Sequence, residues 1–148
     1  MKNFKVIPVL GLAMLIVGCG TNAAPKETIT LYKSYTCGCC NGWKDHMVSN
    51  GYQVKVVNMQ DQDMPAIKRK YGISNSLKSC HTSIIGDYIV EGHIPSNVVD
   101  KLLTEKPAID GIAMAGMPSG SPGMPGSKNE AWKIYSFKNG KISMYDEL

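Results

Sequence analysis

The chain has 148 residues, a length typical of one domain, with 16 basic and 12 acidic residues and a formal net charge of +4. The one basic run, Lys68-Arg69-Lys70, stands where a helix is expected to end, and there positive charge complements the helix dipole. Charge and composition therefore give no reason to expect a nucleic-acid partner.

Residues 1–19 have the pattern of an export signal. Two lysines precede an apolar stretch that is too short to span a bilayer. The stretch ends in Ile16-Val17-Gly18-Cys19, which resembles the lipobox of bacterial lipoproteins. That resemblance implies that Cys19 becomes the lipidated first residue of the mature chain. A plain signal cut a few residues later and an uncleaved anchor are the alternatives.

Removal of this segment takes away two basic residues and no acidic one, so the remaining chain carries a net charge of +2. We expect residues 20–27 to form a short tether and residues 28–148 to form one domain. The expected location is the periplasm, with a lipid anchor as the membrane attachment. Because the periplasm is oxidising, paired thiols there can form disulfides.

The first half of the domain predicts two strands that alternate with two helices. Residues 28–33 alternate in polarity as a strand does, and residues 53–58 repeat that pattern. Residues 41–50 have apolar side chains one helical turn apart, followed by Gly51 as a C-terminal cap. Residues 63–71 carry a proline in the expected first turn and an apolar face.

The second half predicts a hairpin, a helix, a long loop and a second hairpin. Residues 83–90 contain two apolar runs separated by a Gly-Asp turn, and residues 96–105 have a helical apolar face. Residues 108–130 consist mostly of Gly, Pro, Ser, Ala and Met without periodicity. Residues 132–137 and 141–145 are expected strands, joined by an Asn-Gly turn.

This order predicts an α/β fold of the thioredoxin-like class. A βαβ unit is followed by a ββα unit, with an additional C-terminal β-hairpin and a long Gly/Pro/Met-rich loop. The βαβ crossover should be right-handed, with helices covering the sheet. Thioredoxin-like proteins carry a C-x-x-C motif between the first core strand and its helix, and Cys37 and Cys40 have that spacing and position.

Three thiols crowd into four positions at Cys37, Cys39 and Cys40. At a helix N-terminus the dipole and unpaired N–H groups favour thiolate, the reactive and metal-binding form. A thioredoxin-type enzyme has no need of the middle Cys39, whereas three thiolates suit the bridging of soft monovalent ions. A disulfide framework that staples a small fold would instead spread its cysteines along the chain.

Cys80 and His81 come immediately before the third expected strand. In the topology above they should face the C-x-x-C motif, which makes Cys80 a candidate ligand and His81 a weaker one. A structural role in packing is the alternative for both. His93, at the end of the hairpin, is a further candidate ligand, although a structural or solvated role explains it more simply. His46, on the first helix, is more simply explained as part of a solvated face.

The loop 114–126 contains Met114, Met117 and Met124. Thioethers bind Cu(I) and are poor zinc ligands. A loop of this length in a small domain is usually functional or disordered. It could therefore close over the thiols, fill gaps in the core or form a flexible insert.

Four motifs in this order resemble a family of exported bacterial metal-binding proteins that includes the CopG-type copper-resistance proteins. They are Y-K-S-Y-T-C-G-C-C-N-G-W (32–43), S-C-H-T (79–82), E-G-H-I-P (91–95) and G-M-P-S-G-S-P-G-M (116–124). The resemblance implies a thioredoxin-like fold, Cu(I) bound by cysteines, and a periplasmic role in copper tolerance. Family members often have proline where this chain has Tyr35, a change that touches the turn and not the ligands.

Carried over residue by residue, the resemblance makes cysteines the metal ligands and gives two methionines a shielding or completing role. The cysteines are Cys37, Cys39, Cys40 and Cys80, and the methionines are Met117 and Met124. Copper is the implied metal, with one or more Cu(I) ions. Periplasmic copper chaperones or efflux components are the implied protein partners.

The sequence thus favours a periplasmic protein that sequesters, transfers or oxidises Cu(I). A thiol–disulfide oxidoreductase that uses Cys37 and Cys40 is the first alternative, and it rests on fold and spacing alone. A structural zinc site is the second, and the methionines and the clustered spacing oppose it. The sequence leaves open whether the protein is an enzyme with copper or thiol redox activity.

Overall fold

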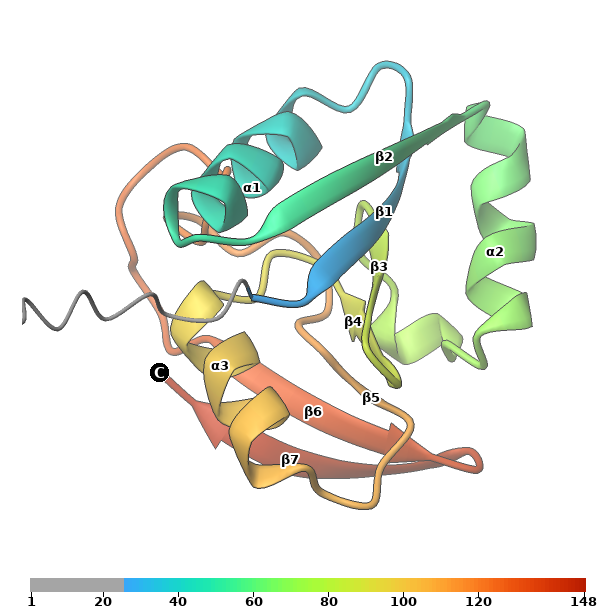
Figure 1. Cartoon of the computed structure of the whole chain (residues 1–148), viewed down its shortest axis with the longest axis vertical. Coiled ribbons are helices and arrows are strands. Elements are labelled where there is room, and N and C mark those ends of the chain that lie inside the picture. The colour runs from blue at the N-terminus through green and yellow to red at the C-terminus, as the bar shows by residue number, and fades with distance from the viewer. Residues whose placement is uncertain (1–25) are drawn as a thin grey trace, which may run out of the picture.

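The computed structural model describes residues 26–148 (Figure 1). The expected signal segment with Cys19, and all of the expected tether except its last two residues, lie outside the described residues. Between residues 26 and 148, no helix has the length and the apolarity needed to cross a membrane.

The described chain is a mixed α/β structure with one seven-stranded sheet. The strands are β1 (Thr28–Ser34), β2 (Gln53–Met59), β3 (Thr82–Ile85), β4 (Tyr88–Glu91), β5 (Gly111–Ala113), β6 (Lys133–Lys138) and β7 (Lys141–Glu147). The α-helices are α1 (Gly38–Ser49), α2 (Met64–Lys70) and α3 (Ser96–Glu105). Short 3₁₀ turns, η1 (Asp61–Asp63) and η2 (Asn75–Leu77), flank α2. Every helix and strand expected from the sequence is confirmed, with ends shifted by up to three residues.

The strands lie in the order β2-β1-β3-β4-β5-β6-β7. β1 is parallel to β2, and β3 is antiparallel to both β1 and β4. The parallel pair β1–β2 is connected through α1, and α3 follows the β3–β4 hairpin. The C-terminal hairpin β6–β7 extends the same sheet (Figure 1).

The segment 108–130 is not structureless, because it contains β5, which joins β4 to β6. Three residues are too few to show an alternating pattern, so this strand was missed in the sequence. Its first residue, Gly111, is required by the close approach of β4, since an added Cβ there would lie 2.2 Å from the Ile89 carbonyl oxygen. Through β5, the hairpin becomes part of the main sheet.

Helices cover both faces of the sheet, with α1 and α3 on one side and α2 on the other (Figure 1). The larger core joins α1 and α3 to β1, β3, β4, β5 and β6, and its fully buried members include Leu31, Trp43 and Leu102. The smaller core, on the α2 side, consists of Ile73, Leu77, Ala113 and Phe137. The sheet is therefore the rigid layer that positions the start of α1.

α1 is fixed by its buried face. Trp43 is fully buried, and its indole N–H donates to the Ile94 carbonyl oxygen at 2.8 Å. His46 Nε2 accepts a hydrogen bond from the Ser96 backbone N–H at 3.1 Å, so α1 also satisfies one free amide at the start of α3. His46 thus has a structural role.

The loop 114–126 packs against the first turns of α1. Met114 is buried in the larger core. Gly123 touches the backbone of α1, because a Cβ added there would lie 2.4 Å from the Cys39 carbonyl oxygen and 2.4 Å from the Trp43 nitrogen. Hydrogen bonds within the loop, such as Met124 N to Ser121 O at 2.8 Å, close it on itself. The loop is therefore built onto the helix that carries the cysteines.

We predict that Gly123→Ala destabilises the protein by about 1–3 kcal/mol more than Gly126→Ala, the usual cost of overpacking. Both glycines have positive φ, +85° and +87°, so an alanine is strained at either position. The nearest neighbour of a Cβ at Gly126 is 3.7 Å away, an ordinary contact. The difference in unfolding free energy between the two variants therefore measures the effect of the close approach of Gly123 to α1.

Urea unfolding of the two variants measures this difference. Equal losses of unfolding free energy would contradict the packing of Gly123 against α1.

Candidate metal centre

The sheet register brings Cys80 to the start of α1. β1 and β3 pair antiparallel with Tyr32 opposite Thr82, so the end of β1, which leads into Cys37, lies beside the start of β3. Cys37 is the N-cap of α1, and its Sγ accepts a hydrogen bond from the Cys40 backbone N–H at 3.3 Å. Cys39 and Cys40 follow within the first turn.

Four sulfur atoms meet there, from Cys37, Cys39, Cys40 and Cys80, and we call this group the cysteine cluster. Their Sγ atoms all lie within 4.8 Å of one another. Cys37 and Cys40 form a disulfide, while Cys39 and Cys80 are free. Cys39 Sγ is 3.5 Å from Cys37 Sγ and 3.5 Å from Cys80 Sγ. The expected juxtaposition of Cys80 with the other three is confirmed, and their role as ligands stays a prediction.

His93 faces the cysteine cluster, although the sequence favoured a structural or solvated role for it. Its side chain is buried, and Nε2 lies 3.3 Å from Cys80 Sγ. Nδ1 lies 2.8 Å from the Pro122 carbonyl oxygen, which can only accept, so Nδ1 carries the hydrogen. Burial lowers the pKa of His93, and the neutral ring then points the Nε2 lone pair at Cys80.

The signal for His93 was present in the predicted hairpin. β3 and β4 pair with Thr82 opposite Glu91, and the Gly92 N–H donates to the His81 carbonyl oxygen at 3.1 Å. Beyond His81 and Gly92, the same register puts Cys80 opposite His93. The two-residue Gly-Asp turn at residues 86–87 already fixes this pairing, so the turn is the sequence signal for the position of His93.

His81 is held away from the cysteine cluster. Its ring packs between Trp43, at 4.6 Å between ring centroids, and His93, at 4.9 Å. The side chain is fully buried, and neither ring nitrogen has a hydrogen-bond partner within the described residues. Burial lowers the pKa of His81 well below its usual value, so the ring is neutral. The structure does not bring His81 into the group of sulfur atoms, and its ligand role stays a prediction.

The loop 114–126, which we call the methionine loop, contacts both chain segments that carry the cysteine cluster. Gly123 touches the helix turn that carries Cys39, and Pro122 holds His93. Next to Met117, the Gly116 N–H donates to the Lys78 carbonyl oxygen at 3.0 Å, two residues before Cys80. Met117 is 55% exposed and Met124 is half-buried. The glycines next to Met117 and Met124 therefore contact the segments that carry the cysteines, while Met114 belongs to the core.

A buried ion pair fixes the backbone on either side of Cys80. Lys68 Nζ lies 2.5 Å from Glu91 Oε1, and both side chains are buried. The carboxylate also accepts the Ser79 backbone N–H at 2.7 Å and the Thr82 hydroxyl at 2.6 Å. Ser79 and Thr82 bracket Cys80, so Glu91 determines where Cys80 lies. From the sequence, Lys68 was expected on a solvated face as part of the basic run 68–70, and Glu91 had no assigned role. The buried ion pair corrects the expectation for Lys68.

The charge state of Cys80 follows from its surroundings. Burial, followed by the contact with Cys39, raises the pKa of Cys80 to about 12. The metal-free protein therefore holds Cys80 as a thiol at neutral pH, and a bound cation would have to displace that proton. Burial likewise raises the pKa of Glu91, against the opposing effect of Lys68.

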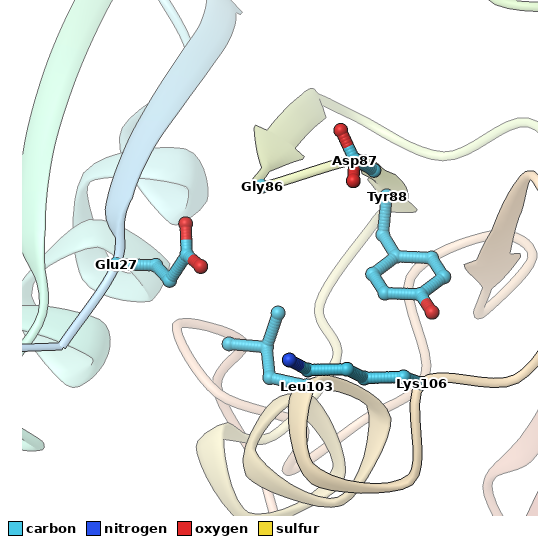
Figure 2. Close-up of a pocket in the computed structure, with 6 residues that line it drawn as sticks. All are labelled: Glu27, Gly86, Asp87, Tyr88, Leu103 and Lys106. Atoms are coloured by element: carbon cyan, nitrogen blue, oxygen red, sulfur yellow. The ribbon is translucent and has the colours of Figure 1, made fainter.

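A hollow of about 220 Å³ lies beside the start of β1 and the end of β3, which are the ends of these strands away from the cysteine cluster (Figure 2). It is lined by Glu27, Gly86, Asp87, Tyr88, Leu103 and Lys106. Glu27 precedes β1 and Gly86 follows β3, whereas Cys37 follows β1 and Cys80 precedes β3. The hollow contains no sulfur or imidazole ligand and is separate from the cysteine cluster.

Comparison with known proteins gives two kinds of match. A family model described as "Protein of unknown function, DUF411" matches residues 77–124, which include Cys80, His93 and all three methionines of the loop 114–126. The solved structure "Copper resistance protein copG- Form 2" is 34% identical with a TM-score of 0.73, over 83% of this chain and 98% of that chain. "Copper resistance protein copG- Form 1" has the same identity and coverage, with a TM-score of 0.72. No curated protein sequence matches the chain.

We predict that Glu91→Ala lowers the free energy of unfolding by roughly 3–5 kcal/mol, because it leaves Lys68 buried without a counter-charge. The double variant Lys68→Met/Glu91→Leu should recover much of that loss, since it removes both charges. Urea unfolding measures both effects.

The matched control is Lys101→Ala, which removes the more exposed pair between Lys101 and Asp146, 2.9 Å apart. Lys101→Ala should lower the free energy of unfolding much less than Glu91→Ala does, because solvent screens the Lys101–Asp146 pair. If Glu91→Ala costs no more than Lys101→Ala, Glu91 does not hold the Cys80 segment.

Proposed function

The chain belongs to the family of CopG-type copper-resistance proteins, and from this membership we propose that it binds Cu(I) in the periplasm and contributes to copper tolerance. The observation that carries the proposal is the cysteine cluster, with four Sγ atoms within 4.8 Å of one another. Thiolate sulfur is the ligand type that Cu(I) prefers. The donor set of this chain therefore fits copper.

The cysteines would bind the ion, and neighbouring residues hold Cys80 and His93 in place. Reduction of the Cys37–Cys40 disulfide by two electrons frees two thiols, and with Cys39 and Cys80 the cluster then holds four. Glu91 positions Cys80, and the Pro122 carbonyl orients His93 so that Nε2 faces the cluster. A second partner that fixes the tautomer of an imidazole is typical of metal-binding histidines.

Cu(I), when bound, supplies a soft cation that several thiolates can share, so more than one ion could be held by bridging sulfurs. Met117 and Met124, on the loop that flanks the cluster, would shield or complete the site. His81 remains a candidate only if its ring leaves the contact with Trp43. Sequestration, transfer and oxidation of Cu(I) are all compatible with such a site, and periplasmic copper chaperones or efflux components are the proposed partners.

The proposed setting follows from the fold and the N-terminal sequence. The strand order β2-β1-β3-β4, with α1 connecting a parallel pair, supports a thioredoxin-like core. The lipobox-like sequence around Cys19 supports export and attachment to a membrane by lipid, with residues 28–148 as the functional domain.

A second candidate function is a periplasmic thiol–disulfide oxidoreductase. The observation that favours it is the Cys37–Cys40 disulfide at the start of α1. This function does not require Cys39 or Cys80, whereas copper binding by the whole cluster does. The two functions are therefore separated by the effect of removing Cys39.

We predict that the reduced full chain binds Cu(I) tightly and that Cys39→Ser weakens the binding by more than the roughly 100-fold typical of losing an outer partner of a metal site. The physical reason is that Cys39 Sγ lies 3.5 Å from both Cys37 Sγ and Cys80 Sγ and would connect them. Anaerobic competition with a Cu(I) chelator measures the affinity. No tight binding by the wild type, or an unchanged affinity with full insulin reduction in Cys39→Ser, would favour the oxidoreductase.

We predict that His93→Gln weakens Cu(I) binding by about 10- to 100-fold, because the lone pair that faces Cys80 is lost or displaced. The matched control is His46→Gln, since His46 is also an imidazole near α1 but bonds to the Ser96 N–H instead. The same competition assay applies to both variants. An effect of His46→Gln as large as that of His93→Gln would contradict a direct role for His93.

We predict that cells expressing the full chain incorporate labelled palmitate into it and that Cys19→Ser abolishes the label, because Cys19 is the acceptor in the lipobox-like sequence. Membrane fractionation should then show release of the variant. Label retained in Cys19→Ser would rule out lipidation at this residue.

A further inference from the structure

The sulfur atoms of the cysteine cluster form a continuous series. The Cys37–Cys40 disulfide comes first. Cys39 Sγ lies 3.5 Å from the Cys37 end of that disulfide, and Cys80 Sγ lies 3.5 Å beyond Cys39 Sγ. Disulfides exchange when a thiolate attacks one of their sulfur atoms. Here each free sulfur is adjacent to the atom that it would have to attack.

We propose that the protein passes its disulfide internally from Cys37–Cys40 to Cys39–Cys80, through a transient Cys37–Cys39 disulfide. This activity goes beyond the proposed function and requires no metal.

The exchange balances within the chain. In the first step Cys39 sulfur bonds to Cys37 sulfur, the Cys37–Cys40 bond breaks, and Cys40 leaves as thiolate. In the second step Cys80 sulfur bonds to Cys39 sulfur, the Cys37–Cys39 bond breaks, and Cys37 leaves as thiolate. The protons lost by Cys39 and Cys80 end on Cys37 and Cys40. No net oxidation occurs, so no external oxidant or reductant takes part.

The geometry favours exchange within one molecule. Reacting atoms about 3–3.5 Å apart are at the separation from which bound groups react without a further search in space. Cys37, Cys39 and Cys40 are held by the start of α1, and Cys80 is held by the backbone bonds of Ser79 and Thr82 to Glu91. Cys40 is fully buried, while Cys39 and Cys80 are partly exposed. The exchange therefore moves the disulfide from a pair with one buried sulfur to a pair that an external thiol can reach.

A peptide map distinguishes the two disulfides. Trypsin cleavage after Lys33 and Lys44 leaves Cys37, Cys39 and Cys40 in one peptide, and cleavage after Lys78 and Lys101 leaves Cys80 in another. A Cys37–Cys40 disulfide stays within the first peptide, and a Cys39–Cys80 disulfide joins the two.

The full chain is reduced, oxidised with one equivalent of diamide and freed of reagent under anaerobic conditions with a copper chelator. It is then incubated for several hours at about pH 8.5, because the raised pKa of Cys80 leaves only a small thiolate fraction there and makes the second step slow. Samples are acidified at intervals, alkylated with N-ethylmaleimide, digested and analysed by mass spectrometry, with fragmentation to identify the linked cysteines.

The proposal expects joined peptides linked through Cys39 and Cys80, in a fraction that does not change when the protein is diluted. Cys39→Ser should abolish the joined peptides while keeping the Cys37–Cys40 disulfide, and circular dichroism checks that this variant is folded. Cys80 recovered only in alkylated form would overturn the proposal. So would joined peptides that persist in Cys39→Ser, or a joined fraction that falls on dilution. None of these outcomes depends on whether copper binds.

Discussion

The register of the β3–β4 hairpin is the constraint on which the site depends. With Thr82 opposite Glu91, the residues before β3 and after β4 are matched in pairs, so Cys80 faces His93 across two neighbouring strands. The pairing of β3 with β1 then places this end of the hairpin beside the start of α1. A slip of one residue would turn Cys80 to the other side of the sheet and separate it from the other three sulfur atoms. Glu91 reinforces the register, because its carboxylate binds the chain on both sides of Cys80.

Much of this arrangement could be predicted from the sequence, because it depends on local patterns. Alternation and helical periodicity gave the strands and helices, and the position of the C-x-x-C motif between β1 and α1 gave the side of the sheet on which Cys80 would lie. β5 was missed because three residues carry no detectable period and its pairing depends on strands distant in sequence. The roles of Lys68 and Glu91 were missed for a related reason. A lysine in a basic run at the end of a helix and a lone glutamate on a strand look solvated until tertiary packing buries them together.

The register of β3 and β4 reverses the order of the two histidines as candidate ligands that their distance from Cys80 in the sequence suggests. His81 follows Cys80 directly, and for that reason it was the favoured imidazole. Adjacent residues in an extended chain point in opposite directions, so His81 enters the core beside Trp43 while Cys80 faces the cluster. His93 is thirteen positions away from Cys80, yet the pairing of strands makes it the closer imidazole. The methionine loop could be identified by composition, but its seat on α1 depends on the close contact at Gly123, which composition does not reveal.

The contact between Trp43 and His81 gives the folded protein an internal optical reporter. Trp43 is fully buried, and its ring lies three residues along α1 from Cys40 and against His81, the neighbour of Cys80. The other tryptophan, Trp132, is half-buried beneath the ammonium group of Lys128, and its indole N–H donates to the Ser119 carbonyl oxygen. Emission from these two indoles therefore reports on different environments. A change in the fluorescence of Trp43 alone would register events at the sulfur atoms without any label attached to them.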